Sequence, residues 1–235
     1  MSLEYRSAVE PARSMASRQV AIDAYGQLTA AILRNDIPPA SRININAVAT
    51  SLGASPTPVR EALAKLEADG LVTQTHLKGY RTTDLLTRSE IEDLWEFRLL
   101  IEPYGAGRAA EQATDDQLKA LRLELTTVPA IPAENTFDSY RQFSAHDERL
   151  HTSFLRMAGN DVVLTSFQRT HCHLHAFRLA YNTAAGVATL EEHTSIGDRI
   201  EHRDAGGATE AMRHHLIESR DRLLPFARAN CELQH

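Results

Sequence analysis

The stretch from Ile45 to Val72, INAVATSLGASPTPVREALAKLEADGLV, constrains the fold more than any other part of the sequence. Gly53 stands where a first short helix must end, at a position that favours a positive φ. Ser55 can cap a second helix, and Pro56 falls in its first turn, where no backbone N–H is needed. Apolar residues then recur at helical spacing, at Val59, Ala62, Leu63 and Leu66. This arrangement is typical of a helix-turn-helix.

The residues that follow predict a β-hairpin, with strands at 71–73 and 80–83 and a turn at 76–79. A helix-turn-helix followed by a hairpin is a winged helix. The segment PASRINI from Pro39 to Ile45, the run LGASPTPVREALAKLEADGLV and the pair Lys78-Gly79 resemble the amino-terminal domain of GntR-family transcriptional regulators. The resemblance implies that residues 17–84 form a domain that binds double-stranded operator DNA.

The second helix of such a motif enters the major groove with its first turn leading. Ser55, Thr57 and Arg60 are therefore expected to face DNA. Arg60 can pair with a guanine through two hydrogen bonds, which discriminates by about 1–3 kcal/mol. The alternative for Arg60 is a solvated side chain that pairs with Glu61 or Glu67.

Lys78 and Gly79, at the tip of the hairpin, are expected to touch the DNA backbone or the minor groove, although a lysine in a turn can also be merely solvated. The sequence departs from the family at two positions, where Pro56 and Asn46 replace basic residues that are usual there. Either the operator differs from the usual one or other basic residues compensate. Three candidates for such compensation are Arg42, Lys65 and Arg81.

Charge is distributed unevenly along the chain, whose formal net charge is -6. Through Asp84 there are nine Lys and Arg against eight Asp and Glu, and the remainder carries sixteen against twenty-three. The amino-terminal part alone can therefore approach phosphates without a strong electrostatic penalty. Cys172 and Cys231 form no CxxC pair, and no apolar run reaches about eighteen residues. The expected location is the cytoplasm, with no membrane association.

A second domain, over residues 85–231, is predicted to be entirely helical. Thr87 and Glu90 form a capping box at its start, and strand signals are absent after Thr136. Six helices are predicted, at about 87–111, 114–128, 137–158, 162–181, 190–204 and 208–229. The expected fold is mainly α: a winged helix-turn-helix with a small hairpin, followed by an all-α antiparallel bundle.

Asp147 falls on the stripe of apolar residues that should face the core of this bundle. A buried carboxylate costs several kcal/mol unless it is paired or bound to a metal. His151 lies one turn further on the same face, and His193 and His215 fall on apolar stripes of two later helices. Three imidazoles and one carboxylate would suit a divalent transition metal, with zinc as first choice and nickel, manganese or iron as alternatives.

The same half resembles the FCD effector domain of FadR-type GntR regulators, over about residues 88–230. The matching residues are Arg98-x-x-Ile101-Glu102, Asp147-x-x-x-His151, Gly159-Asn160, Glu192-His193 and the run Met212 to Leu216. The resemblance implies that Asp147, His151, His193 and His215 bind a divalent metal. It also implies that a small carboxylic acid, the effector, completes the metal's coordination. A purely structural buried Asp–His pair is the alternative.

A tract of three further histidines lies at 171, 173 and 175. In one continuous helix only His171 and His175 would share a face, and His173 would point elsewhere. The tract is therefore not a ready three-ligand site. One of its members can reach the pocket, but a role at the surface or in a groove is favoured.

Arg98 and Arg178 are the candidates for binding the effector. A guanidinium matches a carboxylate through two parallel hydrogen bonds. For Arg98 the alternative is an ion pair with Glu102, one turn further along the helix.

The sequence as a whole predicts a homodimeric, metabolite-responsive regulator of transcription, a repressor rather than an enzyme. Two alternatives remain open. A hydrolase could use the Asp and His cluster as a zinc centre, but it would need a separate general base, for which no motif is present. The metal could instead be purely structural.

Overall fold

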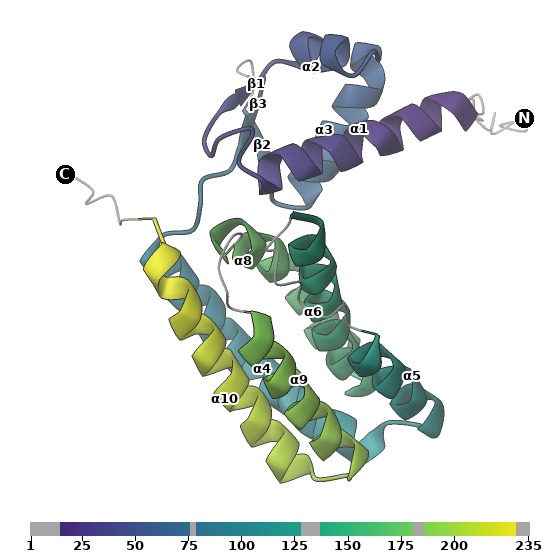
Figure 1. Cartoon of the computed structure of the whole chain (residues 1–235), viewed down its shortest axis with the longest axis vertical. Helices are drawn as coiled ribbons and strands as arrows, with labels where there is room; N and C mark the ends of the chain where they lie inside the picture. Colours follow the sequence, from purple (N-terminus) through teal and green to yellow (C-terminus); the bar gives the residue numbers. More distant parts are fainter. Residues whose placement is uncertain (1–14, 76–78, 128–136, 181–185, 229–235) are drawn as a thin grey trace, which may run out of the picture. The chain divides into compact units, whose positions relative to one another are not determined.

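The computed structural model describes residues 15–75, 79–127, 137–180 and 186–228. The chain divides into two compact units (Figure 1). One comprises Met1–Ile32 and Ala40–Thr83, and the other comprises Leu33–Pro39 and Asp84–His235. The division after Thr83 lies beside the domain boundary that the sequence predicts.

The first unit is a winged helix-turn-helix. Its elements, in chain order, are α1 (Met15–Leu33), β1 (Arg42–Ile43), α2 (Ile45–Ser51), α3 (Pro56–Ala68), β2 (Val72–Thr75) and β3 (Gly79–Thr82). The three strands form an antiparallel sheet in the order β1-β3-β2. The predicted hairpin is therefore joined by a third, short strand, β1.

Local signals account for the turn between α2 and α3. The side chain of Asn44 caps α2 by accepting hydrogen bonds from the next turn, and Gly53 has a φ of 59° just after the helix ends. Ser55 occupies the N-cap position of α3, but its hydroxyl makes no capping hydrogen bond. Val59 and Leu63 are fully buried, so the apolar face of α3 is turned into the core as predicted.

The second unit is a bundle of α-helices. Its elements are α4 (Arg88–Gln112), α5 (Asp115–Thr126), α6 (Phe137–Met157), α7 (Asp161–Arg169), α8 (Cys172–Ala180), α9 (Gly186–Glu201), α10 (Ala205–Leu223) and the 3-10 turn η1 (Leu224–Phe226). The capping box of Thr87 and Glu90 is formed at the start of α4.

The number of helices differs from the prediction. The described part of the bundle contains seven α-helices, because the single helix expected at 162–181 is divided into α7 and α8. His171 lies between them with a φ of 46°, which no α-helical residue can have. The division changes the rotational phase of every residue in α8.

The long helix α4 organises the bundle. It packs along α10, and α6 and α9 also contact it (Figure 1). Pro103 lies within α4 without ending it. Gly107 allows α4 to approach α10 closely, since a Cβ there would meet the side chain of Thr209. The buried core around this crossing includes Trp95, Ala106 and Met212.

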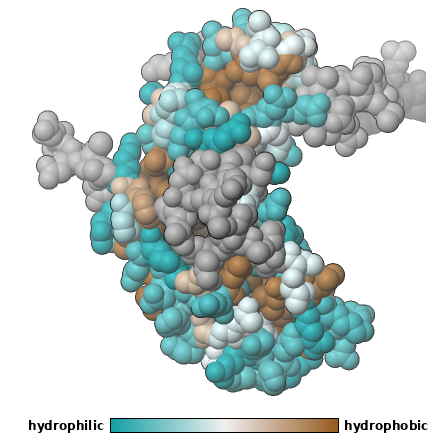
Figure 2. Space-filling model, in the orientation of Figure 1, coloured by the Kyte–Doolittle hydropathy of each residue, from teal (hydrophilic) through white to brown (hydrophobic). Residues whose placement is uncertain are grey.

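The surface of the bundle is mostly polar. Figure 2 shows hydrophilic residues over most of its visible face, with apolar residues in small separate patches. Leu100 and Tyr104, one turn apart on α4, are 73% and 45% exposed. No helix within the described residues is long and apolar enough to cross a membrane.

Candidate functional site

Four side chains from three helices converge inside the bundle. Asp147 and His151 come from α6, His193 from α9 and His215 from α10. One ligand atom from each lies within 4.8 Å of the corresponding atoms of the other three. The three histidines are at most 1% exposed, whereas Asp147 keeps 18% of its side chain exposed. All four residues that the sequence suggests as metal ligands are therefore brought together.

Two of the histidines are oriented by carboxylates outside the cluster. The Nδ1 atom of His151 contacts a carboxylate oxygen of Glu102, and Nδ1 of His215 lies 2.7 Å from Oε2 of Glu192. A carboxylate in such a contact accepts the Nδ1–H, which leaves the Nε2 lone pair available. Burial lowers the pKa of both rings, that of His215 to about 3. Both imidazoles are thus neutral near pH 7, in the form that binds a metal.

The carboxylate of Asp147 is held as an anion at the centre. Its Oδ1 lies 3.1 Å from Nε2 of His193 and 3.7 Å from Nε2 of His151. Its Oδ2 lies 2.6 Å from Nδ1 of His173. Burial alone would raise the pKa of Asp147, but the nearby His151 and the hydrogen bond from His173 hold it well below the usual value.

His173 is the member of the histidine tract that reaches the site, although the sequence favoured a surface or groove role for the tract. Because His171 interrupts the helix, α8 starts anew at Cys172 and turns His173 towards Asp147. His173 is 5% exposed. Burial lowers its pKa, but attraction to the ionised form of the neighbouring Cys172 sulfur and the hydrogen bond to the Asp147 carboxylate outweigh that effect and raise the pKa to about 10. His173 is therefore a hydrogen-bond donor to Asp147.

The residues present fit a divalent transition metal. Nε2 of His151 and both ring nitrogens of His193 are buried and form no hydrogen bond within the described residues; Oδ1 of Asp147 is near both Nε2 atoms but not in hydrogen-bonding geometry. Buried imidazole nitrogens without a partner are rare unless something binds to them. Three imidazole nitrogens and one carboxylate oxygen are a ligand set that zinc accepts.

A cavity of about 50 Å³ adjoins Asp147. Its lining includes Tyr140, His173 and Arg222. Arg222 donates two hydrogen bonds of 2.7 Å to Glu192, the carboxylate that also holds His215. Sequence reasoning missed Arg222, although it stands seven residues after His215 and so two turns along the same face of α10.

The two arginines that were predicted to bind the effector differ in position. Arg98 is 2% exposed, and its Nε donates to Glu102 at 2.5 Å, while Nη2 lies 3.5 Å from Nδ1 of His151. The ion pair with Glu102, the alternative considered for Arg98, is therefore formed. Arg178 donates to the backbone carbonyl of Asp84 at 3.3 Å and does not line the cavity beside Asp147.

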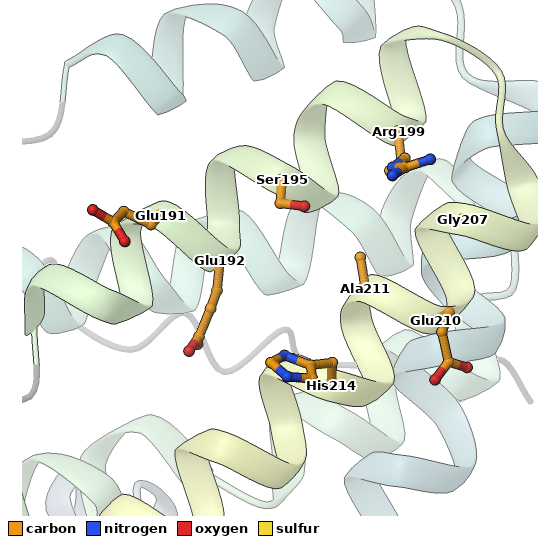
Figure 3. A pocket seen from close by; sticks show the side chains of 8 residues that line it. All are labelled: Glu191, Glu192, Ser195, Arg199, Gly207, Glu210, Ala211 and His214. Atoms are coloured by element: carbon orange, nitrogen blue, oxygen red, sulfur yellow. The ribbon is translucent and has the colours of Figure 1, made fainter.

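A larger and more open depression, of about 620 Å³, lies on the surface between α9 and α10 (Figure 3). Three glutamates line it, Glu191, Glu192 and Glu210, beside a single arginine, Arg199. An excess of carboxylates repels an anionic ligand. This depression is therefore an unfavourable place for an anionic ligand.

In the winged-helix unit, the three predicted DNA-facing residues of α3 lie on one exposed side. Ser55, Thr57 and Arg60 are all exposed, and Glu67 accepts a hydrogen bond from the backbone amide of Gln74. Of the predicted wing residues, Gly79 is exposed at the start of β3 with a φ of 81°. Lys78 lies outside the described residues.

Two of the basic residues that were considered as compensating contacts have partners within the unit. The ammonium of Lys65 lies 3.8 Å above the centre of the Tyr25 ring. The guanidinium of Arg81 donates to the carbonyl of Ala40. Arg42 is exposed in β1. A winged helix in one unit and an all-helical bundle in the other define the class of a DNA-binding regulator with a second, helical domain.

Comparison with known families agrees with this class. Residues 21–81 match the bacterial regulatory proteins of the gntR family, and residues 93–218 match the FCD domain. The chain therefore belongs to the GntR family of transcriptional regulators that carry an FCD domain, which fits the FadR subfamily.

Individual relatives are distant but span most of the chain. YdhC of Bacillus subtilis, an uncharacterised HTH-type transcriptional regulator, is 24% identical over 82% of this chain and 84% of its own length. The transcriptional repressor GlaR of Escherichia coli is 24% identical over 83% of this chain and 92% of its own length. The solved structure of E. coli McbR/YncC covers 88% of this chain and 97% of its own, with a TM-score of 0.67 at 15% identity, and so shares the fold.

Proposed function

We propose that this GntR regulator is a homodimeric repressor whose helical domain binds a divalent metal together with a small carboxylic acid. The observation that carries the proposal is the convergence of Asp147, His151, His193 and His215 within 4.8 Å in a chain that also has a winged helix. Binding of the acid would favour one arrangement of the two winged helices over another. The affinity for operator DNA would then change to the extent that the acid binds one arrangement more tightly than the other.

The four ligand residues would hold the metal, and Glu102, Glu192 and His173 would keep their side chains in place. The bound metal would supply a Lewis-acidic centre to which a carboxylate oxygen can bind. Beside it, Arg222 presents a guanidinium at the wall of the small cavity. Arg98 and Arg178 remain candidate effector groups, and Arg98 also fixes the Glu102 carboxylate that orients His151.

At the DNA, Ser55, Thr57 and Arg60 would read bases, with Lys78 and Gly79 at the backbone or in the minor groove. A homodimer would place two such helices on an operator with two-fold symmetry. The exposed apolar pair Leu100 and Tyr104 on α4 supports burial of a helix face against a second copy. The chain is expected to work in the cytoplasm, where operator DNA is found.

The test starts from an operator selected from random double-stranded DNA with the full-length chain. Its affinity is then measured by fluorescence anisotropy, with zinc-loaded and chelator-treated protein, across a panel of small mono-, di- and hydroxycarboxylic acids. At least one acid is expected to change operator affinity by about 5–150-fold. The change should be lost in Asp147→Asn, while Arg60→Ala should lose affinity for the operator without losing its response to the acid.

Two outcomes would overturn parts of the proposal. If no acid changes the affinity and removal of zinc unfolds the bundle, the metal is structural and no effector site exists there. If the full-length chain selects no preferred DNA sequence, the winged helix does not read an operator.

A further inference from the structure

His193 differs from the other two histidines of the cluster. His151 and His215 each have Nδ1 against a carboxylate, whereas Nδ1 of His193 is buried and has no hydrogen-bond partner within the described residues. A histidine that binds a metal almost always donates its other ring N–H to a neighbour, which sets the tautomer and the ring orientation. His193 therefore needs an acceptor that the carboxylates do not provide.

His146 is the residue placed to be that acceptor. Its ring centre lies 5.7 Å from that of His193, at an interplanar angle of 49°. The two rings are neighbours, but His193 Nδ1 and His146 Nε2 form no hydrogen bond in this structure, so the contact requires a small reorientation of the rings. His146 is 1% exposed, and its Nε2 is also buried without a hydrogen-bond partner among the described residues.

The far side of His146 determines which of its nitrogens can accept. Nδ1 of His146 lies 2.8 Å from Oε1 of Glu124, on α5. A carboxylate can only accept, so His146 carries its proton on Nδ1 and keeps a lone pair on Nε2. Glu124 is itself held by two nitrogens of Arg149, at 2.8 Å and 3.1 Å from Oε1.

We infer that His146 positions His193 for metal binding, as the middle member of a chain that runs from Glu124 through His146 to His193. In this chain the Nδ1–H of His193 donates to Nε2 of His146, and the Nδ1–H of His146 donates to Glu124. The Nε2 lone pair of His193 is thereby directed at the cluster, on the side where Asp147 lies. The inference rests on the proposed function, because it assigns a role towards the same metal.

The chain also reaches the surface. Glu124 and Arg149 both line a cavity of about 270 Å³ between α5 and α6, together with Leu121, Ser153 and Met157. His193 is thus joined to a solvent-accessible ion pair, whereas Glu102 and Arg98 behind His151 are fully buried. Solvent can therefore reach Glu124 behind His193, as it can reach Glu192 behind His215, but not Glu102 behind His151.

The experiment measures zinc affinity of the full-length chain by competition with a chromophoric chelator. His146→Phe keeps the ring's volume but has no acceptor, and it should weaken zinc binding about 10–100-fold. His146→Gln retains a hydrogen-bond acceptor and should therefore lose less zinc affinity than His146→Phe. Glu124→Gln should shift affinity in the same direction as His146→Phe. His214→Phe, whose native side chain is 68% exposed, is the matched control and should bind zinc as the wild type does.

A second readout does not depend on zinc. In ¹⁵N-histidine NMR of the metal-free chain, the Nδ1–H of His193 should give a slowly exchanging resonance that is absent from His146→Phe. A visible spectrum of the cobalt-loaded chain should also differ between the two, because the ligand geometry changes. Wild-type affinity and spectra in His146→Phe would overturn the inference. A wild-type chain that binds no zinc but shows the His193 resonance would instead overturn the proposed function and leave the hydrogen-bonded chain standing.

Discussion

Replacement of Arg98 by Met should strongly destabilise the helical unit. Arg98 and Glu102 are 2% and 1% exposed and form an ion pair of 2.5 Å within α4. Removing one member of a fully buried pair leaves the other charge without compensation, which costs about 3–5 kcal/mol. His151 also contacts Glu102, and burial together with the charge of Arg98 lowers its pKa. Without Arg98 the His151 ring takes up a proton more easily, and the protonated ring partly compensates the charge of Glu102. The loss of stability should therefore lie at the lower end of that range, about 3 kcal/mol.

The same helix contains a matched control. Arg88 and Glu92 have the same i,i+4 spacing and an ion pair of 3.0 Å, but their side chains are 59% and 49% exposed. Arg88→Met should therefore change stability by about 0.5 kcal/mol or less. The double replacement of Arg98 and Glu102 by Met removes both charges and should recover a large part of the loss.

Stability is best measured by urea unfolding of the chelator-treated chain, so that metal binding does not contribute. The sequence has a single tryptophan, Trp95, which is buried in the bundle with the Arg98 guanidinium 4.9 Å from its ring centre. Its fluorescence reports unfolding of this unit, and far-UV circular dichroism serves as a check on variants that alter its surroundings. If Arg98→Met loses no more unfolding free energy than Arg88→Met, the buried ion pair does not make Arg98 important for stability and the prediction is refuted.

Two further predictions concern packing and protonation. Gly107→Ala should destabilise the bundle by about 1–3 kcal/mol, because the added Cβ would collide with the side chain of Thr209. Gly206→Ala is the control, because a Cβ there has open space around it. Equal melting temperatures for the two variants would contradict the prediction. Burial lowers the pKa of His175 to about 4. The positive charges of Arg178 and His171 act in the same direction, and Glu90 partly offsets them. Between about pH 6.5 and 4, His175 is protonated in the unfolded chain but not in the folded one. The stability that the neutral buried ring contributes is therefore complete above pH 6.5, and about 2 kcal/mol of it is lost by pH 5. Urea midpoints at pH 7.5 and 5 should therefore differ less in His175→Gln than in the wild type, and an unchanged difference would exclude this role.

The winged helix was predictable because its signals are local. Gly53 and Pro56 act within one or two turns of the chain, as the capping box of Thr87 and Glu90 does at the start of the bundle, and helical periodicity orients the apolar faces. The ligand cluster was within reach for the same reason. Asp147 and His151 share a helix face, and His193 and His215 each stand among apolar residues whose burial is readable from spacing.

What could not be predicted depends on contacts between helices. No Gly or Pro marks the break at His171, so the orientation of the α8 side chains, including that of His173 towards Asp147, was not readable from the sequence. His146 stands next to Asp147 in sequence, so periodicity assigns it to a different face of α6. Only the packing of α5 and α9 against α6 reveals that this face is buried as well and holds Glu124 and His193.

The coordination of bound metal tests the account most directly. X-ray absorption at the zinc edge of the full-length chain, loaded with one equivalent of zinc, reports which atoms surround the ion. The account predicts three imidazole nitrogens and carboxylate or water oxygens at about 2.0–2.2 Å, with the imidazole signal reduced in His193→Ala. A sulfur ligand at about 2.3 Å, which would implicate a cysteine, or a spectrum of hydrated zinc without imidazole would contradict it.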